Sequence, residues 1–409
     1  MEFWLPYGAT EVPVAVPDEN LLGFLSPLES STVNNIEGTA ASGLGYQVGD
    51  RRLVEAASQA KKTVIAFNPD SAPSALVARV LAKGLSQKDV EGVCLLESAP
   101  DPTVPRSNEP LADKDLESPC PLTRHDPRYS SCVKVGQLED GAEVLLNETL
   151  ATAEIRCVVT NVAVNPFWGY SGGPSLLAAG LTSEKTMKTT LRSTPKAQRL
   201  PGVLSGNRTY GTLLHISQMI RVDFAVHVVE SPGGKVVGIF AGDFFRTFEQ
   251  ACVSAGQIFR PPVQRKADIV ISSAGGSAWD RTLFDASPSV IMAASCCKDH
   301  GIIVLVAECA DGLGKLSSAG SDARDSKGRR AQSQRGLTLE KVVEYALRRI
   351  AAEHRVYLVS TLPEHEASLY QLLSAKSVSS ALQRAARHTG KDATVVILPY
   401  GGHTAPTVG

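Results

Sequence analysis

The sequence lacks any pair of cysteines in C-x-x-C spacing. Its 8 cysteines are scattered singly, except for one adjacent pair, at positions 94, 120, 132, 157, 252, 296, 297 and 309. C-x-x-C pairs are typical of zinc ribbons and dithiol redox sites, and short secreted domains space their cysteines as a disulfide framework. The sequence predicts none of these, and we expect most of the cysteines to be buried small apolar side chains.

Long apolar runs and a strong net charge are also missing. No stretch approaches the roughly 18 apolar residues of a membrane span, and the first residues contain no basic segment followed by an apolar core. The 41 Lys and Arg residues nearly balance 42 Asp and Glu, for a formal charge of -1. Without a long-range field for nucleic acid or anionic lipid, we expect a cytoplasmic protein whose partner is a small molecule, with no membrane and no nucleic acid bound.

Short apolar runs alternate with amphipathic helical segments along most of the 409 residues. Strands are expected at Val12–Val16, Leu21–Leu25, Thr63–Phe67, Gly92–Leu96, Glu143–Leu146, Ile155–Val162, Phe224–Val229, Val236–Phe240, Ala267–Ser272, Gly301–Ala307, Val356–Ser360 and Ala393–Leu398. Helices are expected at Asp50–Lys61, Ala75–Leu85, Phe244–Gln257, Thr338–Glu353, Glu364–Leu373 and Ser377–His388. This alternation predicts an α/β fold with mostly parallel sheets.

The length allows two or three domains. A proline-bearing segment, Arg260–Arg265, precedes a fresh strand. We therefore expect two α/β domains, 1–265 and 266–409, with a ligand cleft between them. Residues 98–131 and 311–336 are polar stretches expected to be long loops, which in compact domains are often functional.

Glycine-containing turns follow three of the expected strands. Ser171, Gly172 and Gly173 lie in the first turn, Gly275, Gly276 and Asp280 in the second, and Asp311-Gly312-Leu313-Gly314 forms the third. Ligands of open α/β sheets bind beyond the carboxyl ends of strands, where small residues let backbone N–H groups approach an anion. These residues are candidate cofactor ligands; the alternatives are an ordinary turn for the first and helix capping by Asp280.

No Ser-His-Asp arrangement and no metal-ligand spacing stands out, so no metal ligand is assigned. His125-Asp126 can form an oriented acid/base pair, or it can be a solvated pair in a polar loop.

Nearly end to end, the sequence resembles the lactate racemase (LarA-like) family. The motifs that carry the resemblance are Leu5-Pro6-Tyr7-Gly8, Pro17-Asp18-Glu19-Asn20, Val133-Lys134-Val135-Gly136, Trp168-Gly169-Tyr170-Ser171-Gly172-Gly173, Gly180-Leu181-Thr182-Ser183-Glu184-Lys185-Thr186, Gly238-Ile239-Phe240-Ala241-Gly242-Asp243, Gly275-Gly276 with Asp280, Asp311-Gly312 and Val395 to Tyr400. The resemblance implies two α/β domains and a nickel-pincer nucleotide, with which the family racemises or epimerises 2-hydroxy acids by hydride transfer.

Several positions that carry this chemistry in the family differ here. Ser175 stands where the family has the lysine that holds the nucleotide covalently, so covalent attachment is not expected. Asn165 stands at one acid/base histidine and Ala99-Pro100-Asp101-Pro102 at the other, and an amide cannot exchange a proton near neutral pH. The remaining departures are an apolar residue near Leu191 for the nickel-binding histidine, Asn68 to Pro73 for the phosphate-binding Asp-x-Thr-Arg-Pro, Leu313 for a histidine and Pro288 for a substrate-binding lysine.

Three functions stay open. The first is a racemase- or epimerase-family isomerase acting on a small 2-hydroxy acid or sugar acid, with any cofactor held noncovalently at Ser171, Gly172, Gly173, Ser175, Gly275, Gly276 and Asp280. Its candidate catalytic residues are Asn165, His125, Asp70 and Asp101, and Asp280 and Asp285 are further carboxylates on segments that can reach the site. The second is a binding or scaffold homologue that has lost the pincer chemistry. The third is an enzyme rebuilt on the thiols of Cys296 and Cys297.

Overall fold

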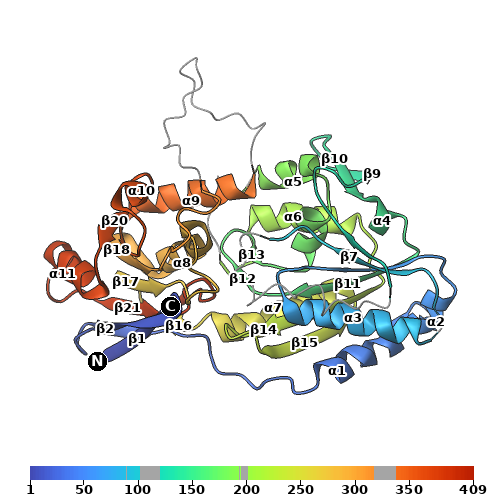
Figure 1. The fold of residues 1–409 in the computed structure, drawn as a ribbon, viewed down its shortest axis with the longest axis horizontal. Coiled ribbons are helices and arrows are strands. Elements are labelled where there is room, and N and C mark those ends of the chain that lie inside the picture. The colour runs from blue at the N-terminus through green and yellow to red at the C-terminus, as the bar shows by residue number, and fades with distance from the viewer. Residues whose placement is uncertain (89, 102–119, 193, 195–200, 317–337) are drawn as a thin grey trace, which may run out of the picture. The chain divides into compact units, whose positions relative to one another are not determined.

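The computed structural model describes residues 1–88, 90–101, 120–192, 194, 201–316 and 338–409. The chain divides into two compact units. Figure 1 shows the fold, coloured by residue number from the N-terminus to the C-terminus. Unit 1 contains Met1–Leu28 and Gln257–Gly409, and unit 2 contains Glu29–Asp101 and the described part of Arg106–Gly256. Both are α/β, as the sequence predicts.

Unit 2 is built on a sheet in the order β15-β14-β11-β6-β7-β8. Its strands are β6 (Thr63–Phe67), β7 (Val93–Glu97), β8 (Leu122–Arg124), β11 (Ile155–Asn161), β14 (Phe224–Glu230) and β15 (Val236–Gly242), all parallel except β15, which runs antiparallel to β14. Separate two-stranded sheets are formed by β4 (Gln47–Val48) with β5 (Arg51–Arg52), by β9 (Cys132–Gln137) with β10 (Glu143–Asn147) and by β12 (Val164–Asn165) with β13 (Gly169–Tyr170).

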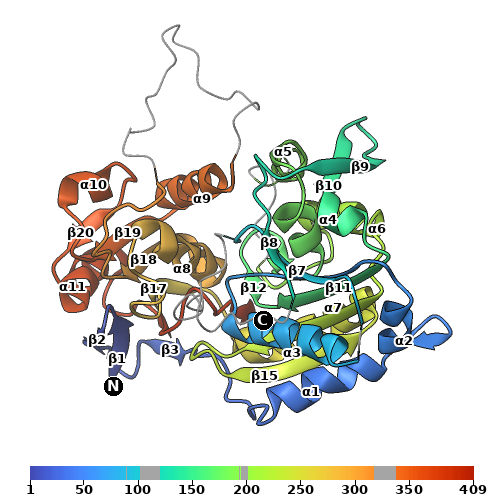
Figure 2. The ribbon, with the colours of Figure 1, turned by 45° about the vertical axis from the view of Figure 1, so that its right-hand side comes forward.

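Helices cover both faces of this sheet. They are α1 (Ile36–Ser42), η1 (Gly43–Gly45), α2 (Leu53–Ser58), α3 (Ala72–Ser86), α4 (Glu148–Ala151), η3 (Leu176–Gly180), α5 (Glu184–Leu191), α6 (Arg208–Gln218) and α7 (Phe244–Phe259). Helices α1 and α3 lie side by side along one face (Figure 2). There the apolar side of α3 packs on alternate residues of the strands, among them Ile65, Val159 and Val228. Strand β6, TVIAF, is buried at every position, as expected of a central parallel strand.

In unit 1 the sheet is entirely parallel, in the order β20-β19-β18-β17-β21-β3. Its strands are β3 (Leu21–Phe24), β17 (Ala267–Ser273), β18 (Cys297–Val306), β19 (Arg355–Val359), β20 (Leu373–Ala375) and β21 (Val395–Leu398), and its helices are α8 (Leu283–Cys296), α9 (Leu339–Glu353), α10 (Glu364–Ser368) and α11 (Val378–Thr389). The antiparallel hairpin of β1 (Glu2–Tyr7) and β2 (Thr10–Ala15) shares a core with α11 on one face. Strand β16 (Pro262–Val263) pairs with β22 (Thr407–Val408).

The division of the chain differs from the predicted 1–265 and 266–409 at its N-terminus. Residues 1–28 pack in unit 1 because β3 adds to the edge of the later sheet, with Leu21 opposite Val395. An apolar period identifies a strand but not the sheet that the strand joins, so sequence order placed this segment in the wrong unit.

Two predicted helices are shorter than expected. The start of Asp50–Lys61 is strand β5, because Gly49, with φ of +62°, turns the chain back onto β4. The expected helix Glu364–Leu373 ends at Ser368, and Leu373 begins the edge strand β20. Residues 102–119 and 317–336 of the two predicted loops lie outside the described residues. The helices of the described residues include no candidate membrane span.

Candidate functional site

In unit 2, the chain order of the strands reverses between β6 and β11. From β6 the chain proceeds outward through β7 and β8, and β11 and β14 are then added on the other side of β6. Ligands of open α/β sheets bind at such a reversal, beyond the carboxyl ends of the strands. The residues found there are Asn68, Asp70 and Ser71 after β6, Asn161 at the end of β11 and Glu230 at the end of β14.

Ser71 and Glu230 form the central polar contact at this edge. The Ser71 hydroxyl is hydrogen-bonded to Glu230 Oε1, and it also caps α3 by accepting the Ser74 backbone N–H at 3.0 Å. Both side chains are buried. Burial raises the pKa of Glu230 to about 7, and the bond to Ser71 lowers it in part. A carboxyl group that titrates near neutral pH can act as an acid or a base there.

Sequence reasoning missed Glu230. The strand that ends with it, FAVHVVE, is buried at all seven positions. An acidic residue within such an apolar run was the available signal, because buried carboxyl groups are rare without a partner or a function.

Asp70 and Asp101 are two predicted site residues that the structure brings together. Asp70 is buried, and its Oδ2 accepts the Asp101 backbone N–H at 2.8 Å. Asp70 immediately precedes Ser71, the N-cap of α3, so the carboxyl groups of Asp70 and Glu230 both lie near the start of this helix. In the family that the sequence resembles, the corresponding segment contains an arginine and binds a phosphate. The segment Asn68 to Pro73 contains no arginine, so it lacks the guanidinium group that would bind a phosphate.

The first glycine turn is held by a buried chain of hydrogen bonds. His227 Nε2 donates to the Phe244 carbonyl (3.1 Å), His227 Nδ1 accepts from the Thr160 hydroxyl (2.7 Å), and that hydroxyl accepts the Gly173 N–H (3.2 Å). His227 is fully buried, and burial lowers its pKa to about 4, so the ring is neutral at pH 7. Side chains alternate between the two faces along β11 and β14. Thr160 and His227 therefore lie on one face of the sheet, and Asn161 and Glu230 lie on the other face with α3.

Packing explains both glycines of this turn. Gly172 and Gly173 have φ of +74° and +47°. A Cβ at Gly172 would lie 2.4 Å from the Asn161 carbonyl oxygen, and one at Gly173 would lie 2.4 Å from the Phe248 ring. The turn requires glycine at both positions whether or not a ligand binds.

Both serines of the turn are engaged with the backbone. The Ser171 hydroxyl bonds to the N–H and C=O of Ala163, at 3.0 and 3.3 Å. Ser175 precedes η3, and its hydroxyl donates to the Gly172 carbonyl at 3.1 Å. Both are buried.

Asn165 and His125 likewise hold local structure. Asn165 is fully buried, and its Oδ1 accepts the N–H groups of Phe167 (2.8 Å) and Trp168 (3.2 Å). His125 is buried, with Nε2 bonded to the Thr182 carbonyl (3.0 Å) and Nδ1 bonded to the Asn147 amide (2.9 Å). Burial lowers the pKa of His125. Both ring nitrogens are occupied, and Asp126 instead accepts the Arg128 N–H, so the predicted oriented His125-Asp126 pair is not formed.

In unit 1, the second glycine turn follows β17. Gly275 and Gly276 have φ of +118° and +88°, and a Cβ at Gly275 would lie 2.9 Å from Trp279. Asp280 is fully buried, and its Oδ2 accepts the N–H groups of Gly8 (2.8 Å) and Glu308 (3.1 Å). It ties the β1–β2 hairpin to the β17 and β18 turns and does not cap the following helix, whose cap is Thr282. Asp280 Oδ1 is buried without a partner among the described residues.

His403 was also missed by sequence reasoning. It follows β21, and its ring meets Trp279 edge to face, with centroids 4.5 Å apart. Its Nε2 has no hydrogen-bond partner within the described part of the chain, and burial lowers its pKa to about 4.

These pKa values predict acid destabilisation. A histidine in the unfolded chain has a pKa near 6.5. In the folded protein the pKa of His403 is about 4, so between pH 4 and 6.5 the unfolded state binds more protons than the folded state. Stability is full above about pH 6.5 and falls as the pH is lowered, by about 2 kcal/mol per such histidine at pH 5. His403→Phe keeps the ring contacts and removes the titration. We expect its loss in unfolding free energy between pH 7 and 5, measured in urea, to be about 2 kcal/mol smaller than that of the wild type.

Exposed His365 supplies the control, because His365→Gln leaves the buried ring in place. An identical pH dependence for His403→Phe and wild type would contradict this assignment.

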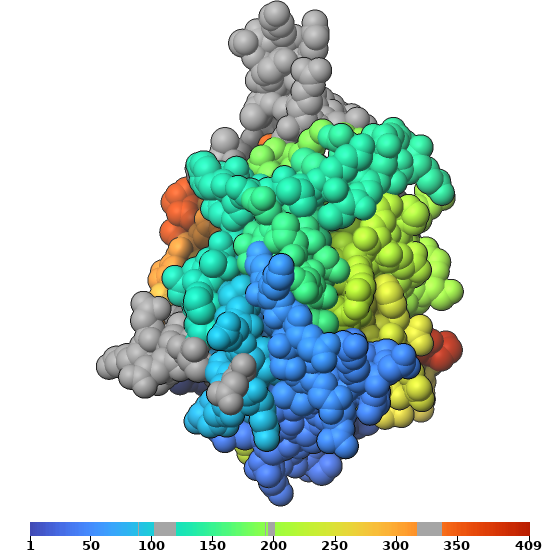
Figure 3. All heavy atoms as spheres, turned by 90° about the vertical axis from the view of Figure 1, so that its right-hand side faces the viewer, coloured from blue at the N-terminus to red at the C-terminus, as the bar shows by residue number. Residues whose placement is uncertain are grey.

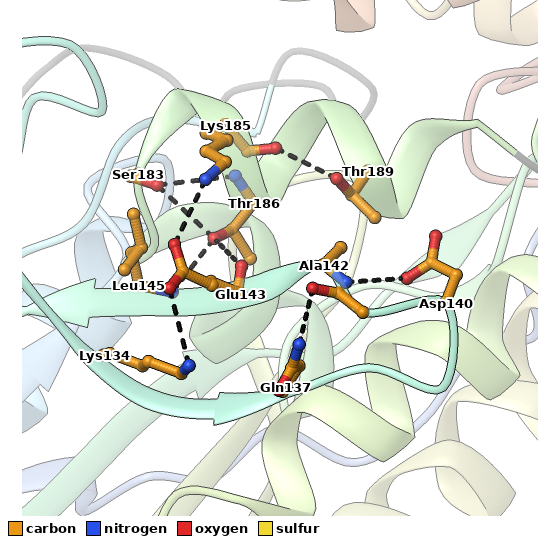
Figure 4. Close-up of polar contacts among 11 residues, drawn as sticks. Lys134, Gln137, Asp140, Ala142, Glu143, Leu145, Ser183, Lys185, Thr186 and Thr189 are labelled. Atoms are coloured by element: carbon orange, nitrogen blue, oxygen red, sulfur yellow. Dashed lines mark hydrogen bonds and ion pairs between the residues drawn. The ribbon is translucent and has the colours of Figure 1, made fainter.

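A surface ion cluster joins the β9–β10 hairpin to α5. Glu143 lies between Lys134 (3.4 Å) and Lys185 (3.2 Å), and the Thr186 hydroxyl connects the Glu143 carbonyl to the Leu145 N–H (Figure 4). The two lysines lower the pKa of Glu143. The hairpin lies at the surface (teal in Figure 3). Lys185 of the GLTSEKT motif contacts it through the ion pair with Glu143.

The cysteine-based alternative loses its basis. Cys296 and Cys297 are fully buried, and burial raises the pKa of Cys296 to about 12 and that of Cys297 further. Neither is a thiolate at neutral pH, and the thiolate is the reactive form. In the described part of the chain, no three His, Cys, Asp or Glu side chains are grouped to hold a metal ion.

Comparisons with known proteins agree with this architecture. The family model of the lactate racemase N-terminal domain matches residues 7–195, and that of the lactate racemase C-terminal domain matches residues 263–403. Lactate racemases from Lactiplantibacillus plantarum and Thermoanaerobacterium thermosaccharolyticum are 25% and 24% identical, each over 97% of both chains. The solved lactate racemase apoprotein from T. thermosaccharolyticum superposes with a TM-score of 0.84 at 23% identity, with both chains fully covered. A protein from Thermotoga maritima matches with a TM-score of 0.64 at 15% identity, over 94% of this chain and 100% of that one. The chain thus belongs to the lactate racemase family.

Proposed function

We propose that this protein binds a small 2-hydroxy acid or sugar acid at the carboxyl edge of the unit 2 sheet, without a covalently held nickel-pincer nucleotide. The observation that carries the proposal is the buried Ser71–Glu230 contact at the point where the strand order reverses. A hydroxyl and a carboxyl group placed there are suited to a ligand that presents hydroxyl groups.

The residues present do not fit the family's cofactor. The Ser175 hydroxyl stands in place of an amine and donates to the Gly172 carbonyl. Leu191, near the position matched to the nickel ligand, is apolar and buried. The phosphate segment carries Asp70, and the start of α3 also faces Glu230. These substitutions remove the covalent link, a metal ligand and the arginine whose positive charge would bind the cofactor's phosphate.

A non-catalytic binding homologue is the second candidate. Its support is that Asn165, which stands at one expected acid/base position, and His125, a candidate replacement acid or base, are both held in buried local hydrogen bonds. Fold similarity alone does not separate the two candidates.

Thermal unfolding with added ligands tests binding. We expect at least one of lactate, glycerate and gluconate, at about 100 times its dissociation constant, to stabilise the protein by about 2.7 kcal/mol. For a unit of this size that corresponds to a rise in Tm of about 5–10 °C. Propionate, which lacks the hydroxyl, and erythritol, which lacks the carboxylate, are the matched controls. A panel in which no hydroxy acid shifts the Tm contradicts the proposal.

Incubation of each bound acid with the protein in D2O, read by chiral chromatography and mass, separates the two candidates. Racemisation or epimerisation supports the isomerase. A ligand that binds and is recovered with its configuration unchanged supports the binding homologue.

A further inference from the structure

Glu230 is an acidic side chain that is buried without a cation from the described part of the chain. Its side chain is hydrogen-bonded only to Ser71 among the described residues, and it makes no ion pair there. The neighbouring chargeable groups are Asp70, which is adjacent to Ser71, and His227, which lies on β14 with its side chain on the opposite face. A fold has no need of such a group for stability, because desolvating a carboxyl group costs free energy that one hydrogen bond recovers only in part.

Ser71 connects Glu230 to a second hydroxyl. Ser71 Oγ lies 2.9 Å from Ser74 Oγ and has a single proton to donate. When Glu230 is ionised, the Ser71 proton points at the carboxylate. When Glu230 is protonated, its own O–H donates to Ser71, and Ser71 donates to Ser74. Both protonation states are satisfied by rotating hydroxyl groups, so the contact holds Oε1 in place and leaves Oε2 for another partner.

The edge of the sheet offers two acceptors that have no partner among the described residues. Asn161 Oδ1 is buried and unpartnered there. The hydrogen bond of the Glu230 side chain to Ser71 uses Oε1, so Oε2 makes none within the described part of the chain. Asn161 pairs in register with Val228, two residues before Glu230 on the adjacent strand. The backbone of Asn161 is fixed by Asn68, whose Oδ1 accepts its N–H at 3.0 Å. A buried acceptor without a partner, such as Asn161 Oδ1, is costly unless a donor arrives.

We propose that Glu230, oriented by Ser71, binds a hydroxyl group of the ligand through Oε2, with Asn161 Oδ1 as the neighbouring acceptor. This inference rests on the proposed function and names the residues that select for hydroxyl groups. It needs no oxidant, metal or cofactor, because the interaction is a hydrogen bond. A site whose acceptors are left unpaired by a deoxy analogue discriminates strongly against it.

The test is calorimetric binding of lactate, glycerate and gluconate at pH 8 to wild type, Glu230→Gln and Glu97→Gln. Glu97 ends β7 at the same edge of the sheet, but it is paired with Arg124 at 3.2 Å and makes a matched control. We expect Glu230→Gln to weaken the best hydroxy acid at least tenfold while propionate is unchanged. Glu97→Gln should stay within twofold of wild type.

Each outcome bears on a different claim. Equal affinity of wild type and Glu230→Gln for the hydroxy acid overturns this inference and leaves the proposed function standing. A wild type that binds none of the three acids overturns both. If Glu230→Gln does not fold, as judged by circular dichroism, Ser71→Ala replaces it: the carboxyl group stays but loses its orienting partner. A hydroxy-acid affinity unchanged in Ser71→Ala overturns the inference, and a loss of at least threefold supports it.

Discussion

Gly172→Ala is expected to destabilise the protein by about 4 kcal/mol. The glycine has φ of +74°, and its new methyl group would lie 2.4 Å from the Asn161 carbonyl oxygen and 2.8 Å from Thr160 Oγ1. The left-handed conformation costs an alanine about 1–2 kcal/mol. The remainder is overpacking against backbone that belongs to β11 and cannot shift without disturbing the sheet. Urea unfolding followed by circular dichroism measures the loss.

Gly206 provides a matched control for this substitution. Its φ is +73°, nearly the same, yet a Cβ there would meet nothing within 4 Å. Gly206→Ala should therefore cost only the conformational part, about 1–2 kcal/mol. Equal losses in the two variants would show that the contact with Asn161 adds nothing, and the argument that packing requires Gly172 would fail.

Thr160→Val should cost about 3 kcal/mol although it conserves shape. The hydroxyl of Thr160 donates to His227 Nδ1 and accepts the Gly173 N–H. Valine leaves both groups buried and unpaired, at about 1–3 kcal/mol each. Because the first glycine turn depends on this hydroxyl, the variant should also expose that turn to faster backbone hydrogen exchange, which mass spectrometry of its peptides measures.

Thr63→Val is the control from the neighbouring strand. Thr63 is fully buried at the start of β6, and its hydroxyl has no partner among the described residues. Replacing it removes an unpaired polar group, so the unfolding free energy should change by less than about 0.5 kcal/mol or rise. A loss as large as that of Thr160→Val would mean that the two hydroxyl groups are equivalent, contrary to the hydrogen bonds described.

The glycine turns show where sequence patterns are ambiguous. Ser171, Gly172 and Gly173 fit a backbone cradle for an anion, and they equally fit a turn crowded against β11 and Phe248. The two explanations predict the same residues, and only the neighbours of each Cα distinguish them. Asn165 and His125 are similar cases, because a side chain that can take part in catalysis can also complete a buried hydrogen bond. Their assignment as catalytic residues stays a prediction.

Glu230 is the opposite case. It is far from Ser71 in sequence, and nothing in a run of apolar residues tells which helix terminus its last side chain will meet. The contact exists because β14 and β6 flank β11 in one sheet, so their carboxyl ends and the start of α3 meet at one edge. The departures from the family's chemistry, by contrast, are identified from the sequence alone, because each of them replaces one functional group by another at a single position.

The sequence alone determined the α/β class, the family and most strands and helices, because these depend on local period and on motifs a few residues long. It also determined that Ser175 cannot replace an amine, since that is a property of one side chain. Tertiary structure decided which sheet takes β3, which glycines are crowded and which carboxyl group is buried beside a helix start. Each of these depends on contacts between segments distant along the chain, and such contacts leave no periodic trace in either segment.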